Sequence, residues 1–158
     1  MTEDTLASFT AQYRINLERS YSHPIDRLWS ALTNVQEISA WMKYPVTWDG
    51  KVGERFLIEF GCDDESIDGL VTEATEGKVF SYTWGDGIVK WEIEEAGEGT
   101  RLKFSHSGVP TSYAIGVGAG WHAFIDHLGS HLDGLKVEDN YKVLEELYEL
   151  KVKPELPV

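Results

Sequence analysis

Hydrophobic and polar residues follow two different periods along the chain, and each change of period marks a boundary between predicted elements. Residues 12–18 alternate polar with apolar side chains and place Tyr13, Ile15 and Leu17 on one face, which predicts a half-buried strand. The same alternation returns in five segments that we expect to be strands, at residues 54–60, 66–75, 78–84, 87–94 and 100–106. Glycine-containing turns connect these segments at short spacing, so the pattern predicts an antiparallel meander.

A helical period separates the first predicted strand from the meander. Ile25, Leu28, Trp29 and Leu32 recur at spacings of three and four, which is one apolar face of a helix. Asn34 is a favoured residue for capping a second short helix that ends near Trp41. Two short helices are therefore predicted after strand one.

The helical period returns after the meander, from about residue 118 to residue 135. Its apolar face carries Trp121, Phe124, Ile125 and Leu128, and a further charged amphipathic stretch covers residues 137–152. The pattern as a whole predicts an α+β fold in which a curved antiparallel sheet surrounds a long C-terminal helix. We expect one domain at residues 1–137, with a helical extension at 138–158 packed on or next to it.

A series of short motifs adds a family resemblance to this pattern. The motifs are His23-Pro24-Ile25-Asp26-Arg27-Leu28-Trp29-Ser30-Ala31-Leu32-Thr33, Trp41, Val52-Gly53, Phe56, Gly69, Val71, Tyr82-Thr83-Trp84, Gly99-Thr100-Arg101-Leu102, His106-Ser107-Gly108 and Gly120-Trp121. In this order and spacing the chain resembles the activator of heat-shock-protein-ninety ATPase homologue-like family of the START-like (SRPBCC) superfamily, over about residues 12 to 135. The resemblance implies a helix-grip fold with a deep hydrophobic cavity between the sheet and the C-terminal helix.

The predicted inward faces are rich in aromatic rings, and this enrichment leaves two interpretations open. The rings either fill a solid core or line a pocket, since ligand sites are mostly apolar with a few polar groups. Under the second interpretation the ligand-binding residues are Trp41, Phe56, Ile58, Tyr82, Trp84, Trp91, His106, Trp121, Phe124 and Leu128.

Charge and cysteine content narrow the range of partners. The formal net charge of -13 would repel nucleic acid and an anionic membrane surface, so neither is expected as a partner. The single cysteine, Cys62, cannot form an internal disulfide, and no N-terminal secretory segment or membrane span is apparent. We expect a soluble, cytoplasmic protein and an unreactive Cys62.

Histidines and acidic residues are the remaining candidates for chemistry. His127 and His131 are spaced to share one metal ion, but a third ligand is missing, and the helical pattern places both on a solvated flank with His122 pointing outward. The acidic residues 63–68 lack the spacing of a calcium loop. We therefore predict no metal and no cofactor. His106 has the inward parity of its strand, where it would be either a paired core histidine or an acid or base in the cavity.

Three functions remain compatible with the sequence. The preferred hypothesis is a non-enzymatic protein that binds a small hydrophobic molecule. The alternatives are an enzyme of cyclase or lyase type using His106, and a chaperone-related regulator or interaction module that acts through its acidic surface and the tail at 138–152. The same tail could form a homodimer. Gly116, Gly118 and Gly120 either act as a hinge at the cavity mouth or allow close packing of helix and sheet.

Overall fold

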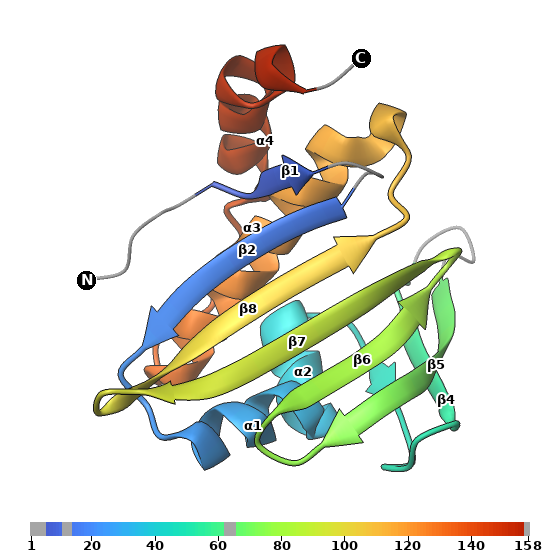
Figure 1. Cartoon of the computed structure of the whole chain (residues 1–158), viewed down its shortest axis with the longest axis vertical. Helices are drawn as coiled ribbons and strands as arrows, with labels where there is room; N and C mark the ends of the chain where they lie inside the picture. The colour runs from blue at the N-terminus through green and yellow to red at the C-terminus, as the bar shows by residue number, and fades with distance from the viewer. Residues whose placement is uncertain (1–5, 11–13, 62–65, 157–158) are drawn as a thin grey trace.

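A single twisted antiparallel sheet forms one layer of the molecule (Figure 1). The structure is a computed structural model that describes residues 6–10, 14–61 and 66–156. Within these residues the strand order is β1-β2-β8-β7-β6-β5-β4-β3, with every neighbouring pair antiparallel. The strands are β1 (Ser8–Thr10), β2 (Arg14–Tyr21), β3 (Val46–Thr47), β4 (Arg55–Glu59), β5 (Ser66–Thr75), β6 (Val79–Trp84), β7 (Gly87–Ala96) and β8 (Gly99–Ser107).

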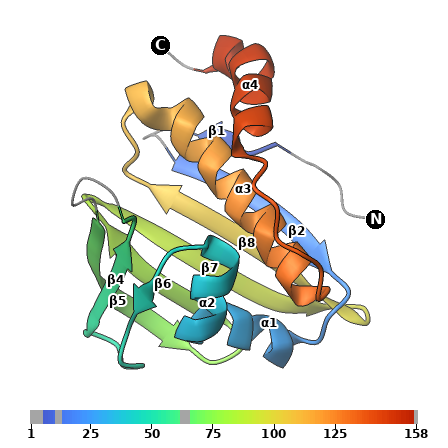
Figure 2. The ribbon, with the colours of Figure 1, turned by 180° about the vertical axis from the view of Figure 1, so that it is seen from behind.

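Helices form the second layer, and the longest of them crosses the inner face of the sheet (Figure 2). They are α1 (Ile25–Thr33), α2 (Val35–Met42), η1 (Thr111–Tyr113), α3 (Ala114–Leu132), α4 (Tyr141–Lys151) and η2 (Lys153–Glu155). α1 and α2 lie on the same side of the sheet as α3, and α4 packs against α3 near β1. This arrangement confirms the predicted α+β helix-grip architecture.

Local sequence explains where the two short helices begin. α1 follows Pro24, whose ring fixes the backbone angle that an entering helix needs. The Asn34 side chain accepts hydrogen bonds from the backbone N–H groups of Gln36 and Glu37, so it caps α2 as predicted.

Side chains alternate between the two faces of each strand, and those on one face of the sheet form the core. Trp91 on β7 lies opposite Phe80 on β6 and Phe104 on β8, so three rings lie side by side across neighbouring strands. All three are buried, and Trp121 from α3 packs on Phe104 with a ring-centroid distance of 4.5 Å. Cross-strand aromatic pairs and the burial of large rings supply much of the stability of such a core.

Two short strands and some boundaries differ from the predictions. β1 and β3 were not expected, because three and two residues are too few to show an alternation. β2 runs to Tyr21 rather than residue 18, and Tyr13 lies outside the described residues, as do Cys62 and residues 63–65.

The glycine string lies inside α3, which begins at Ala114 rather than at residue 118. A Cβ atom on Gly118 would lie 2.7 Å from the ring of Phe9 on β1. Gly118 therefore allows α3 and β1 to approach closely, which supports the packing interpretation of this glycine over the hinge.

Candidate functional site

The predicted ligand-binding residues all lie in the core between the sheet and the helices. Eight of them are buried, and Trp84 and Phe124 are half-buried. Their rings contact one another: Trp41 meets Trp91 at 5.8 Å, Phe56 stacks on Tyr82 at 4.1 Å, and Trp84 meets Trp121 at 4.9 Å. Most of the predicted lining is therefore engaged in ring-to-ring packing.

His106 is held by this aromatic core. The Nε1–H group of Trp121 donates a hydrogen bond of 2.9 Å to Nδ1 of His106, and the rings of Trp84 and Trp121 flank the imidazole. Burial lowers the pKa of His106 to about 4, so the ring is neutral at pH 7. An imidazole whose accepting nitrogen already receives a hydrogen bond has the contacts of a paired core histidine.

Two hollows lie on different flanks of α3. The smaller one, which we call the α2–α3 cavity, has a volume of about 400 Å³, within the range of small-molecule sites. Its lining is largely apolar and aromatic, and comes from the ends of α2 and β4, from α3, and from the segment before α4 with the first residue of that helix. The lining residues are Met42, Lys43, Tyr44, Phe60, Gly120, Ala123, Phe124, His127, Asp139 and Tyr141.

The rim of the α2–α3 cavity is fixed by backbone geometry at the end of α2. Lys43 ends this helix in the left-handed conformation, with a φ of 65°, which is uncommon for a residue with a side chain. Its ammonium group donates to the carbonyl oxygen of Val137, and so ties the end of α2 to the segment that follows α3. Phe124 is the residue common to the cavity and the predicted ligand site, and its ring lies 6.3 Å from that of Trp41.

His127 lines the α2–α3 cavity, and its burial corrects the prediction of a solvated flank. The side chain is 5% exposed, and neither ring nitrogen has a hydrogen-bond partner among the described residues. Burial lowers the pKa of His127. The Trp41 backbone, whose contact with the ring lacks the geometry of a hydrogen bond, and the carboxylates of Asp139 and Asp126 act in the opposite direction. The cavity thus combines apolar walls with one buried, unpaired polar group.

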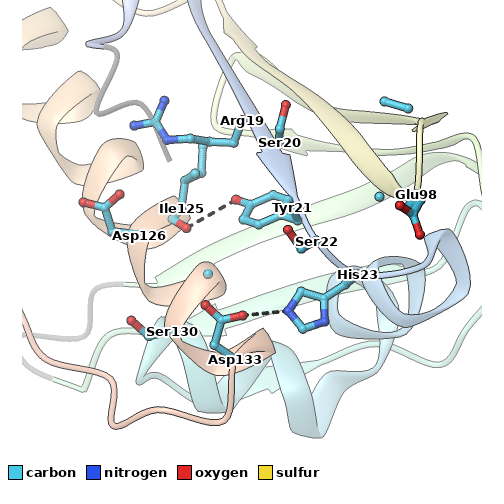
Figure 3. A pocket seen from close by; sticks show the side chains of 13 residues that line it. Arg19, Ser20, Tyr21, Ser22, His23, Glu98, Ile125, Asp126, Ser130 and Asp133 are labelled. Atoms are coloured by element: carbon cyan, nitrogen blue, oxygen red, sulfur yellow. Dashed lines mark hydrogen bonds and ion pairs between the residues drawn. The ribbon is translucent and has the colours of Figure 1, made fainter. Parts of the chain in front are cut away.

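The larger hollow is a polar groove of about 990 Å³ on another flank of α3 (Figure 3). Side chains of the groove have partners within it: the Tyr21 hydroxyl donates to the backbone carbonyl of Ile125 at 3.4 Å, and the His23 side chain contacts that of Asp133 at 2.7 Å. The groove is lined by Arg19, Ser20, Tyr21, Ser22, His23, Ala96, Glu98, Gly99, Ile125, Asp126, Gly129, Ser130 and Asp133.

A buried polar network lies behind this groove and includes His122, which was predicted to point outward. His122 is 1% exposed, because α4 and the N-terminal segment cover that flank of α3. Arg19 can only donate, so it donates to Nε2 of His122 at 3.0 Å, and Nδ1–H donates to the Tyr148 hydroxyl at 2.9 Å. The same Tyr148 oxygen accepts from the backbone N–H of Ala7 at 2.7 Å. The network connects β2, α3, α4 and the N-terminal segment.

The two histidines proposed as a metal pair have different environments. His131 contacts Glu37 at 2.8 Å, whereas His127 faces the cavity. Among the residues that the structure describes, no group of three or more His, Cys, Asp or Glu side chains is placed to hold a metal ion.

In the described part of the chain, no helix combines the length and the apolar character that crossing a bilayer requires.

The comparisons with known proteins agree with this architecture. The model of the family described as activator of Hsp90 ATPase homolog 1-like protein matches residues 22–133, which is more than half of the chain. The chain belongs to this family. No curated protein matches it.

Solved structures show the same fold over most of the chain. A conserved protein of unknown function from Enterococcus faecalis, EF2215, superposes with a TM-score of 0.77 at 20% identity, covering 96% of this chain and 91% of that one. Protein MLL2253 from Mesorhizobium loti superposes with a TM-score of 0.70 at 28% identity, covering 77% of this chain and 97% of that one. The Aha1 dimer from Colwellia psychrerythraea superposes with a TM-score of 0.66 at 20% identity, covering 75% of this chain and 95% of that one. These likenesses establish the helix-grip fold of this family member.

Proposed function

We propose that this protein binds a small, mostly apolar molecule in the α2–α3 cavity. The observation that carries the proposal is an aromatic-walled space of about 400 Å³ between two helices and a strand end. Spaces of this size and character are the usual form of small-molecule sites. The predicted interior site shifts accordingly, from the packed rings around Trp91 to the cavity beside Phe124.

Several lining residues suit a flat, apolar ligand. Tyr44 and Phe60 meet edge to face at 4.9 Å on one wall, and Phe124 and Tyr141 contribute rings from α3 and α4. Aromatic walls bind aromatic ligands through offset or edge-to-face contacts in addition to area burial. Because Phe124 contacts both Trp41 and Trp121, a bound molecule would alter the surroundings of two tryptophans.

The proposal is tested by filling the cavity from α3. A Cβ atom on Gly120 would lie 3.8 Å from the Tyr141 ring, an ordinary contact, so Gly120→Leu adds a side chain next to the cavity without a backbone clash. Leucine is also a better helix former than glycine. The matched control is Ser130→Leu, which places the same side chain on the same helix but against the polar groove.

The measurement is binding of 1-aminoanthracene, a neutral fluorescent aromatic molecule, together with the shift in melting temperature caused by a varied set of apolar compounds. We expect the Kd to rise at least about tenfold in Gly120→Leu, because the added side chain occupies the cavity, and to stay unchanged in Ser130→Leu. The shift in melting temperature should fall with the affinity, because a ligand that binds only the folded state stabilises it by an amount that grows with the logarithm of ligand concentration over Kd. The proposal would be overturned if the dye and every compound failed to bind the unaltered protein. Equal loss of affinity in both variants would also contradict it.

A further inference from the structure

His127 differs from the other buried histidines in its hydrogen bonding. His106 accepts from Trp121, and His122 is bonded to Arg19 and Tyr148. Both nitrogens of His127 lack a hydrogen-bond partner among the described residues, although the ring is buried. A buried polar group without a partner is uncommon in proteins and calls for a physical explanation.

The location of His127 supplies that explanation. Its ring lies in the wall of the α2–α3 cavity, next to Phe124 at a ring-centroid distance of 6.2 Å. In the structure neither nitrogen is accessible, either from solvent or from the cavity. The χ2 torsion of histidine, however, has a broad energy profile. A rotation of the imidazole can therefore turn a nitrogen toward a molecule in the cavity.

The charge state of the ring defines which ligand group it can recognise. Burial and the nearby Lys43 ammonium favour the neutral imidazole. The Trp41 backbone and the carboxylates of Asp139 and Asp126 oppose them without reversing the lowered pKa. A neutral imidazole has one N–H donor and one accepting nitrogen. It is therefore suited to a group that can both donate and accept a hydrogen bond.

Charged ligand groups fit the cavity less well. The two ionic groups of the lining, Lys43 and Asp139, have opposite charge and are exposed, so they leave no net charge to hold an ion. Both are also engaged, Lys43 with the Val137 carbonyl and Asp139 with the backbone N–H of Tyr141. Transfer of a ligand carboxylate or ammonium into apolar walls is strongly unfavourable without a charged partner.

We propose that His127 binds the hydroxyl group of an otherwise apolar, aromatic alcohol or phenol held in the α2–α3 cavity. This inference rests on the proposed function, because it names the ligand class for the same cavity. After rotation of the ring, the hydroxyl donates to the accepting nitrogen of His127 or accepts from its N–H. The aromatic body packs on Phe60, Phe124 and Tyr141.

The experiment compares two probes of nearly equal shape, 2-naphthol and 2-methylnaphthalene, by displacement of 1-aminoanthracene. The measured quantity is the Kd of 2-methylnaphthalene divided by the Kd of 2-naphthol, which removes effects common to both probes. In His127→Leu we expect this ratio to fall about tenfold, because one hydrogen bond to a buried partner is lost for the hydroxyl probe alone. The matched control is His131→Leu, one turn further along α3, where the histidine contacts Glu37 and does not line the cavity. The ratio should not change there.

A second measurement follows the His127 ring directly in the unaltered protein. Nitrogen-15 NMR of the imidazole should show a shift on addition of 2-naphthol that 2-methylnaphthalene does not cause. An unchanged Kd ratio in His127→Leu, or equal imidazole shifts with both probes, would overturn the hydroxyl assignment while leaving the cavity as a binding site. Failure of both probes and the dye to bind would instead contradict the proposed function itself.

Discussion

Two flanks of helix α3 each carry a buried histidine, and the two histidines differ in their hydrogen bonding. His122 and His127 lie little more than one turn apart on the same helix, and both are at least nine-tenths buried. On the flank that faces β2 and α4, His122 is hydrogen-bonded to Arg19 and Tyr148. On the flank that faces α2, His127 has no hydrogen-bond partner among the described residues and lines a cavity. The paired ring connects several elements of the fold, whereas the unpaired ring is the one that we propose binds a ligand hydroxyl.

Removal of the hydrogen-bonded His122 ring should lower the stability of the folded protein strongly. His122→Leu removes one hydrogen-bond partner each from the buried Arg19 guanidinium and the Tyr148 hydroxyl. Buried groups that lose a partner bear the cost of desolvation, so we expect the free energy of unfolding to fall by roughly 3 kcal/mol. Urea denaturation followed by tryptophan fluorescence measures this change.

The control for this variant is His131→Leu, which breaks a contact with Glu37 at a half-buried site. Such partly exposed pairs contribute about 1 kcal/mol or less. A loss in His122→Leu no greater than that of the control would contradict the structural role of the network.

Acid should destabilise the folded protein through its buried histidines, because burial lowers the pKa of both His106 and His127. An unfolded His106 has a pKa near 6.5, but burial lowers its pKa in the folded protein to about 4. The unfolded state therefore binds more protons below about pH 6.5, and the stabilising contribution is present above that pH and is lost as the pH falls toward 4. A shift of this size corresponds to about 3 kcal/mol when fully developed.

The measurement is the free energy of unfolding between pH 7 and pH 4 for the unaltered protein and for His106→Gln, whose amide oxygen can still accept from Trp121. The slope with pH should be smaller in the variant. Parallel curves for the two proteins would show that His106 titrates with an unshifted pKa.

The sequence predicts the side of α3 that faces the sheet but not the covering of its other flanks. Trp121, Ile125 and Leu128 follow the helical period, and all three are buried as expected. His122 was assigned to solvent because its partners, Arg19 and Tyr148, come from distant parts of the chain. A hydrophobic period identifies the apolar side of a helix, and it does not reveal a second helix that packs on the polar side.

The position of the cavity was equally inaccessible to pattern analysis. The alternation along the strands correctly placed Phe56, Tyr82 and Trp91 in the interior, but it could not distinguish packed rings from rings that line a space. That distinction depends on ring orientations and on the left-handed turn at Lys43, which no local pattern indicates. A lysine is among the less expected residues at a positive φ, so the sequence carries no signal for this rim.

His127→Leu tests the difference between the two flanks of α3 most directly, because little change in stability is expected. His127→Leu replaces an unpaired polar ring with an apolar side chain of similar size next to the Phe124 ring, and removes no hydrogen bond among the described residues. Replacing a buried group that lacks a partner by an apolar one is neutral or stabilising, so we expect the free energy of unfolding to change by between zero and about +1 kcal/mol. Urea denaturation in the absence of ligand measures this change next to His122→Leu. A destabilisation of similar size in both variants would mean that His127 has a structural partner, and the difference between the two flanks of α3 would then disappear.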